Sequence, residues 1–209
     1  MIRRRAMAGW RRPLRRISYD AETGLTPENT PGWAAPAGNG AGTLTVIGGE
    51  AALQISGTAQ AGWTLDAPAA HACAFWCEIA VTGSLTGVTY LAAVLPGADG
   101  AAGVGVRFRA LSNYLSIAVG DGSTALSTSL PKGQKCLLRI DWANGEVRYF
   151  ANGDLFRTDS SLAALGSEAA FFPELDSLGY DGTKPFLGIA AHGGTVSLYR
   201  CGYEELSPS

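Results

Sequence analysis

The stretch "WANGEVRYFANGDLF", Trp142 to Phe156, holds two Asn-Gly pairs, at positions 144–145 and 152–153. Asn and Gly both tolerate positive φ, which a two-residue type I′ turn requires at its two central positions. The stretch therefore predicts two tight hairpins in succession. Together with the residues on either side, these hairpins would form a three-stranded meander over residues 136–159.

The first of these hairpins has one apolar face. With its turn at 144–145, the apolar cross-strand pairs are Leu138 with Ala151, Ile140 with Tyr149, and Trp142 with Val147. On the other face Asp141 meets Arg148, a pair of opposite charge worth about 0.2–1 kcal/mol. A strict two-residue turn at 152–153 would place Arg157 opposite Arg148, so we expect that loop to be longer or bulged. The apolar face requires a second sheet to cover it.

Apolar and polar residues alternate along most of the chain after about residue 43, with turn residues between the alternating segments. The predicted strands lie at 43–47, 51–56, 62–66, 71–81, 88–96, 103–110, 113–120, 135–142, 185–191 and 195–203. Only residues 160–172 show a helical pattern, which predicts a short helix or a turn. Many short strands at this spacing predict an all-β sandwich or barrel, and 209 residues suit a single core.

The composition excludes several classes of protein. Hydrophobic residues make up 46% of the chain, charged residues 16%, and there are 28 Gly. This balance disfavours a coiled coil and a disordered acidic chain, and it suits a protein with many turns. No apolar run reaches 18 residues, and no apolar core of a secretion signal follows the first arginines. We therefore expect neither a signal peptide nor a membrane-spanning segment.

The charge is divided unevenly between a basic arm and an acidic body. Residues 1–16 hold seven Arg and no acid, whereas residues 17–209 hold nine basic and eighteen acidic residues, a net charge of −9. We expect residues 1–17 to be an extended arm that docks on an acidic partner; a solvated tail is the alternative. Nucleic acid is disfavoured because the body is acidic. The predicted partner-binding residues are Arg3, Arg4, Arg5, Trp10, Arg11, Arg12, Leu14, Arg15 and Arg16.

Three stretches carry a family resemblance: "LPKGQKCLLRIDWANGEVRYFANGDLF" (130–156), "FLGIAAHGGTVSLYRCGYEEL" (186–206) and the opening "YDAETGLTPENTPGW" with the strands up to residue 56. They resemble the concanavalin A-like lectin/glucanase (LamG-type) jelly rolls, which share a strand leading into a "vyvNG" strand and a closing "fxIG" pair. The resemblance spans about residues 18–206. It implies a jelly-roll sandwich of two antiparallel sheets over residues 18–209.

Glycosidases of this superfamily use carboxylates in an E-x-D-x-(x)-E pattern, because cleavage of a glycosidic bond requires two acidic groups. The only partial match is Glu174 with Asp176, where Leu178 and Gly179 occupy the places of the third carboxylate. His71 and His192 lie far apart, and no nucleotide or hydrolase motif is present. The sequence therefore predicts that the protein is not an enzyme.

The four cysteines have no zinc-site spacing. Cys73, Cys77 and Cys136 fall on predicted inward faces, which favours buried free thiols that act as small apolar residues. Cys201 is expected to be the thiol most available for a disulfide, and cross-strand or intermolecular bridges remain the alternative.

Lectin-like relatives bind calcium through loop carboxylates and bind sugars by stacking on aromatic rings. The resemblance thus implies Tyr180, Asp181 and His192 as carbohydrate contacts. No cofactor is predicted, although the resemblance leaves calcium open through Asp99, Asp121 and Asp181. The alternative is that these Asp-Gly pairs only form turns and that His192 is an exposed turn residue.

These features together predict a non-enzymatic structural component of a tailed-phage or phage-derived particle, because LamG-like domains of phage structural proteins look similar. A capsid decoration, head fibre or tail fibre would be made in the host cytoplasm and reside in the virion. The arm would bind other virion subunits in an oligomeric assembly, without a membrane partner. The alternatives are a lectin-like module that attaches to cell-surface glycans and, third, a glycoside hydrolase.

Overall fold

The computed structural model describes residues 13–34, 42–66, 72–83, 89–95, 104–110, 114–119, 124–131, 133–143, 146–159, 184–191 and 193–207. These residues form fourteen strands and two short 3-10 helices, η1 (Ala21–Thr23) and η2 (Pro27–Asn29). Within these ranges no helix is long and apolar enough to span a bilayer. The helix or turn expected at 160–172 lies outside the described residues.

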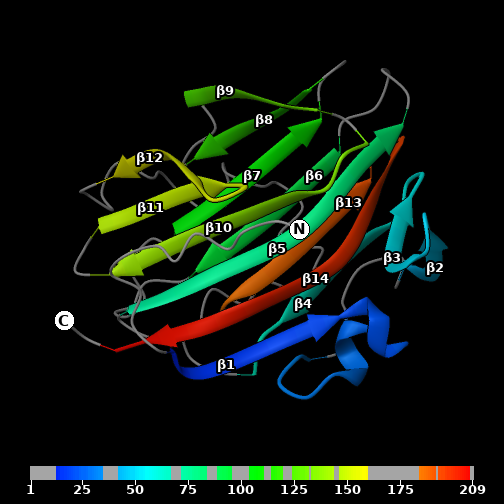
Figure 1. Ribbon diagram of the computed structural model, residues 1–209, viewed down its shortest axis with the longest axis horizontal. Coiled ribbons are helices and arrows are strands. Elements are labelled where there is room, and N and C mark those ends of the chain that lie inside the picture. Colours follow the sequence, from blue (N-terminus) through cyan, green and yellow to red (C-terminus); the bar gives the residue numbers. More distant parts are fainter. Residues whose placement is uncertain are drawn as a thin grey trace.

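The strands form two antiparallel sheets that lie one over the other (Figure 1). The larger sheet runs β12–β11–β10–β5–β14–β3–β2. β3 pairs with the first part of β14, and β1 pairs with the part of β14 that follows. Its strands are β1 (Pro13–Asp20), β2 (Thr43–Ile47), β3 (Glu50–Ser56), β5 (Ala72–Gly83), β10 (Cys136–Ala143), β11 (Glu146–Ala151), β12 (Asp154–Asp159) and β14 (Gly194–Leu206).

The smaller sheet has six strands in the order β4–β13–β6–β7–β8–β9. Its strands are β4 (Gln60–Thr64), β6 (Thr89–Leu95), β7 (Val104–Ala110), β8 (Tyr114–Val119), β9 (Thr124–Pro131) and β13 (Phe186–Ala191). The two sheets enclose one core, which includes Phe75 and Ile79 of β5, Trp63 of β4 and Leu187 of β13. The prediction of a two-sheet antiparallel sandwich is confirmed.

The meander has the predicted register. The pairs Leu138–Ala151, Ile140–Tyr149, Trp142–Val147 and Asp141–Arg148 all form between β10 and β11. At the second turn Asn152 and Gly153 have φ of 52° and 92°, as a type I′ turn requires. The loop is two residues long, and the expected bulge lies in the strand instead, between Tyr149 and Phe150. This shift places Arg157 opposite Tyr149, so that the two arginines do not face each other.

A bulge in β14 changes which of its residues face the core. Val196 and Leu198 point inward, but the register shifts between Leu198 and Arg200, after which Cys201 and Tyr203 point inward. The expectation that Cys201 is the most available thiol is therefore wrong, because its side chain is fully buried. Without the bulge, simple alternation would have turned Arg200 and Glu204 toward the core.

The sequence patterns did not predict β1 or β9. β1 begins within the segment assigned to the basic arm, and it pairs along β14 from Pro13–Leu206 to Asp20–Arg200. Its residues Ile17 and Tyr19 are buried in the core. Residues 13–17 are therefore held in the larger sheet.

All four cysteines are free and buried, which confirms the expected buried thiols for Cys73, Cys77 and Cys136. Cys77 of β5 lies directly opposite Cys201 of β14. Burial raises the pKa of Cys73 and of Cys136 to about 12. The interior thus favours the neutral thiol form.

We expect Gly153→Val to lower the free energy of unfolding by about 1–2 kcal/mol, because a Cβ at positive φ clashes with the backbone. The matched control is Leu155→Thr in the same hairpin, at an exposed position where we expect a change within about 0.5 kcal/mol. Urea denaturation measures both. Equal losses in the two variants would contradict the turn assignment.

The buried thiols predict a stability that falls as the pH rises. Thiols of the unfolded chain ionise near their ordinary pKa of 9, whereas Cys73 and Cys136 stay neutral in the fold up to about 12. Between these values the folded state binds more protons, so stability falls by about 1.4 kcal/mol per thiol and pH unit. Urea denaturation at pH 8 and pH 10 should show a smaller fall for Cys136→Ala than for the unmodified protein, and equal falls would refute the coupling.

Candidate functional site

The outer face of the larger sheet is covered by ion pairs between neighbouring strands. At its centre Arg139 Nε donates to Asp141 Oδ1 at 2.5 Å, and Arg139 Nη1 donates to Glu204 Oε2 at 3.0 Å. Glu204 also lies 3.6 Å from Arg16 Nε of β1. Burial raises the pKa of Asp141, and the guanidinium of Arg139 opposes that rise. The carboxylates here are thus engaged by cations of the same face.

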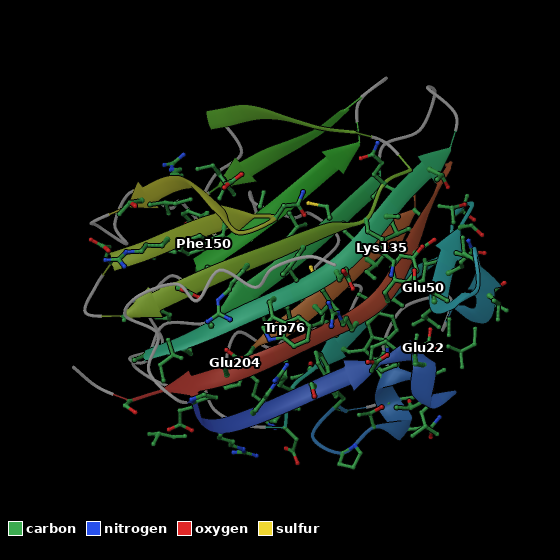
Figure 2. The ribbon with its side chains drawn as sticks, in the orientation of Figure 1. Glu22, Glu50, Trp76, Lys135, Phe150 and Glu204 are labelled. Carbon is green, nitrogen blue, oxygen red and sulfur yellow. The ribbon has the colours of Figure 1, made fainter. Side chains whose placement is uncertain are left out.

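The same pairing extends across the rest of this face. Arg200 Nε donates to Glu78 Oε2 at 2.7 Å, and Arg148 pairs with Glu146. Lys135 Nζ lies 2.6 Å from Glu50 and 3.9 Å from the ring centroid of Tyr199. Figure 2 labels Lys135, which precedes β10, and Glu50, at the start of β3, close to each other. The larger sheet therefore neutralises most of its own surface charge.

An indole packs on a glycine at the centre of this face. Trp76 is only 7% exposed, and the guanidinium of Arg16 lies 5.3 Å from its ring centroid. A Cβ at Gly202 would lie 2.6 Å from Cζ2 of Trp76 and 2.9 Å from the carbonyl oxygen of Ile17. Figure 2 shows Trp76 and Glu204 on this face. The face is filled by its own side chains, and it offers little room for a ligand.

The outer face of the six-stranded sheet has a different composition. Ala61 and Trp63 of β4, and Leu187 and Ile189 of β13, point into the core. Because strand residues alternate between faces, the partners Gly62 and Gly188 belong to the outer face. The pairing continues from Gly188 across the sheet to Ala92, Arg107, Ala118 and Ala125. All residues in this row are small except Arg107.

The adjacent row on the same face adds an aromatic residue and a second cation. It runs from Gln60 through Ala190, Tyr90 and Arg109 to Ser116. Successive rows are about 6.6–6.8 Å apart along a strand. The six strands contain no Asp or Glu, and Arg107 and Arg109 are their only cations. We call the face defined by Gly62, Gly188, Tyr90, Arg107 and Arg109 the arginine face.

The end of this face formed by β4 and β13 is buried. Gly62 and Gly188 are both buried, although neither carries a side chain that could enter the core. Phe186, which shares their outer side of β13, is fully buried and stands outside the core cluster. Other parts of the chain therefore cover the outer face at β4 and β13.

Most residues predicted as site residues lie outside the part of the chain that the structure describes: Arg3, Arg4, Arg5, Trp10, Arg11, Arg12, Tyr180, Asp181 and His192. Leu14, Arg15 and Arg16 lie in β1, and Leu14 is 65% exposed. Sequence reasoning missed Tyr90, Arg107 and Arg109. Their signal was the stretch "VGVRFRA", in which Arg107 and Arg109 alternate with apolar residues.

The described ranges contain no candidate metal site. No group of three or more His, Cys, Asp or Glu there could hold a metal ion. Asp99, Asp121, Asp181, Glu174 and Asp176, the residues considered for calcium or for catalysis, all lie outside those ranges.

Comparison with known proteins connects the chain to others by fold alone. No family model matches the sequence, and no curated protein resembles it in sequence. One matched structure is described by the words "Prominent members of the human gut microbiota express endo-acting O-glycanases to initiate mucin breakdown". Its TM-score is 0.61 at 9% identity, and the match covers 94% of this chain and 100% of that chain. The apo Crh5 transglycosylase matches with a TM-score of 0.57 at 14% identity, covering 93% and 85%. The Ca²⁺/Man-bound exoplasmic/lumenal domain of VIP36 matches with 0.57 at 12%, covering 92% and 91%.

These matches correct one prediction. The conclusion that the protein is not an enzyme is wrong, because it treated the missing E-x-D-x-(x)-E pattern as decisive. A transglycosylase and a protein described among O-glycanases have the same fold.

The matched structures also include forms with bound metal, so calcium is compatible with the fold. The chain is a concanavalin A-like jelly-roll β-sandwich, as the sequence resemblance implied.

Proposed function

We propose that this protein binds carbohydrate on the arginine face of its six-stranded sheet. The observation that carries the proposal is the fold, which the chain shares with a solved carbohydrate recognition domain. The two sheets also differ in the residues of their strands. The larger sheet pairs its charges internally and fills its centre with Trp76. In the smaller sheet the backbone register aligns Gly62 with Gly188 and Tyr90 with Arg109, and the strand sequences contain no Asp or Glu.

This set of residues suits a sugar for three reasons. Glycine and alanine allow a ligand to approach the strand backbone closely. Tyrosine combines an apolar ring with a hydroxyl group that forms hydrogen bonds. Arginine presents five N–H donors, which match the many oxygen acceptors of a saccharide.

The fold adds support, because its solved members include proteins that act on or hold carbohydrate. VIP36 was solved in a Ca²⁺/Man-bound form and Crh5 in complex with NAG. The Emp46p domain of the same fold is a carbohydrate recognition domain.

The test is glycan-array screening followed by titration calorimetry, with calcium supplied. Tyr90→Ala should weaken binding about tenfold, since it removes a ring contact and a hydrogen bond worth about 1–2 kcal/mol together. The matched control is Phe150→Ala, an aromatic residue of β11 on the outer side of the larger sheet, labelled in Figure 2. It should leave affinity within about twofold. Failure of the folded protein to bind any glycan, or equal losses in the two variants, would refute the proposal.

We propose in addition that the basic arm binds a neighbouring subunit of a tailed-phage or phage-derived particle. Support comes from β1, which pairs only with β14 among the described strands and so presents an open edge. Exposed Leu14 and Arg15 stand at the beginning of this edge. Open edges and exposed apolar side chains next to cations are features of segments that dock on other chains.

Deletion of residues 2–12 tests the arm without removing β1. We expect the truncated protein to fold with unchanged thermal stability. Its incorporation into particles should fall about tenfold or more, because the deletion removes five arginines. Quantitative immunoblotting of purified particles measures incorporation. Full incorporation of the truncated protein would refute the role of the arm.

A further inference from the structure

Two of the four free cysteines face each other in the middle of the larger sheet, where β5 and β14 lie side by side (Figure 1). Cys77 of β5 is directly opposite Cys201 of β14, and both side chains belong to the buried core. We propose that this pair is a redox-sensitive crosslink: when the chain folds in an oxidising solution, Cys77 and Cys201 form a disulfide that joins β14 to β5. This proposal goes beyond carbohydrate binding and does not depend on it.

The backbone geometry suits a disulfide between these two residues. Directly opposed residues of an antiparallel pair have Cα atoms about 4.5–5.5 Å apart. A disulfide spans Cα separations of about 4.4–6.8 Å. Both side chains point to the inner side of the sheet, so a bridge requires rotation of side chains and no separation of the strands. The β14 bulge creates this arrangement, because unbroken alternation would have turned Cys201 to the outer face.

The other two cysteines are poorly placed to bridge with either member of the pair. Cys136 lies opposite Ile79, which makes it a diagonal neighbour of Cys77, and such neighbours are about 7–8 Å apart. This distance exceeds the Cα separation of about 7 Å beyond which a disulfide does not form. Cys73 precedes Cys77 by four residues on the same strand, a distance of about 13 Å. The register therefore favours a single bridge, between Cys77 and Cys201.

The folded sheet shields both sulfur atoms from an oxidant. Cys77 is 1% exposed and Cys201 is fully buried. Their row continues to Tyr19 of β1 on one side and to Leu138 of β10 on the other, and both of these residues are buried. Burial raises the pKa of both thiols, so the fold disfavours the thiolate that attacks a disulfide. The pair is therefore oxidised before the larger sheet closes, and the closed sheet keeps the redox state with which it formed.

A small-molecule disulfide such as oxidised glutathione supplies the oxidising equivalents. In the open chain the Cys201 thiol gives its proton to water, and the thiolate attacks one sulfur of the glutathione disulfide. The S–S bond of glutathione disulfide breaks, and one glutathione leaves as a thiolate that takes up a proton. The Cys77 thiol then loses its proton, attacks the Cys201 sulfur of the mixed disulfide and displaces the second glutathione. Two protein thiols are oxidised by two electrons, and one glutathione disulfide is reduced to two thiols.

The crosslink stabilises the fold because it closes a large part of the chain into one loop. The segment between Cys77 and Cys201 contains every strand from β6 to β13. A disulfide lowers the conformational entropy of the unfolded chain, and a longer loop loses more of it. We expect the oxidised protein to unfold at a urea concentration about 1 M higher than the reduced protein.

The experiment refolds the full chain from urea in two buffers, one with reduced glutathione alone and one with an excess of oxidised glutathione. Alkylation under denaturing conditions counts the free thiols, which should fall from four to two after oxidative refolding because the bridge consumes two. Peptide mapping without reductant should show one linked pair, Cys77 with Cys201. Protein that is folded first and then exposed to oxidised glutathione should keep all four thiols.

The variants identify the bridge through the difference in urea midpoint between oxidised and reduced samples of each protein. Cys201→Ala and, separately, Cys77→Ala should each abolish this difference. The matched control, Cys73→Ala, removes a buried thiol from the same strand as Cys77 and should keep the difference within about 0.3 M. Because each variant is compared with itself, a general loss of stability cancels.

Four results would overturn the proposal or a defined part of it. An unchanged thiol count after oxidative refolding, or a linked peptide that contains Cys73 or Cys136, refutes the pairing of Cys77 with Cys201. A difference in urea midpoint that survives Cys201→Ala refutes the crosslink as its cause. Oxidation of the folded protein as fast as that of the unfolded chain refutes the shielding by the closed sheet.

Discussion

The fold depends on the burial of the inward side of β5 between its two long neighbours. β5 pairs with β10 along one edge and with β14 along the other, so Phe75 and Ile79 lie at the centre of the larger sheet. These side chains leave water only when the opposing sheet covers them, and burial of apolar area is the main source of stability in such a sandwich. The three-stranded meander and the β14 bulge both serve this requirement, because each turns apolar residues toward the same interior.

The two sheets differ in the charged residues of their strands. Charged side chains on a surface stabilise a fold little unless they are closely paired. In the larger sheet, Arg139, Glu204 and Arg16 form ion pairs that link three strands. The strands of the smaller sheet contain two arginines and no Asp or Glu in their sequences.

Local chemistry made much of the fold predictable. The register of β10 with β11 followed from one Asn-Gly pair, because a two-residue turn leaves only one alignment. The clash that strict pairing would create between Arg148 and Arg157 predicted an irregularity in the loop, whereas the structure keeps the two-residue loop and shifts the register between Tyr149 and Phe150. The inward position of Cys201 was missed, although the alternation breaks at Arg200, where a charged residue follows Val196 and Leu198 on the inward positions and so marks the β14 bulge.

The arginine face was out of reach of sequence reasoning for another reason. Gly188 pairs with Gly62 and with Ala92, although these residues are far apart along the chain. No periodicity within one segment reveals which distant strand will lie beside it. The candidate residues that sequence did suggest, Tyr180 and Asp181, came from a turn motif and the family resemblance, and they lie outside the described ranges.

The pairing of β1 with β14 has a consequence for how the protein forms during translation. Asp20 and Arg200 are neighbours in the sheet, yet they are separated by almost the whole length of the described chain. β1 can pair only after β14 has been synthesised, so Ile17 and Tyr19 stay open to chaperones until then. Pairing of β1 is therefore a late step in the assembly of the larger sheet.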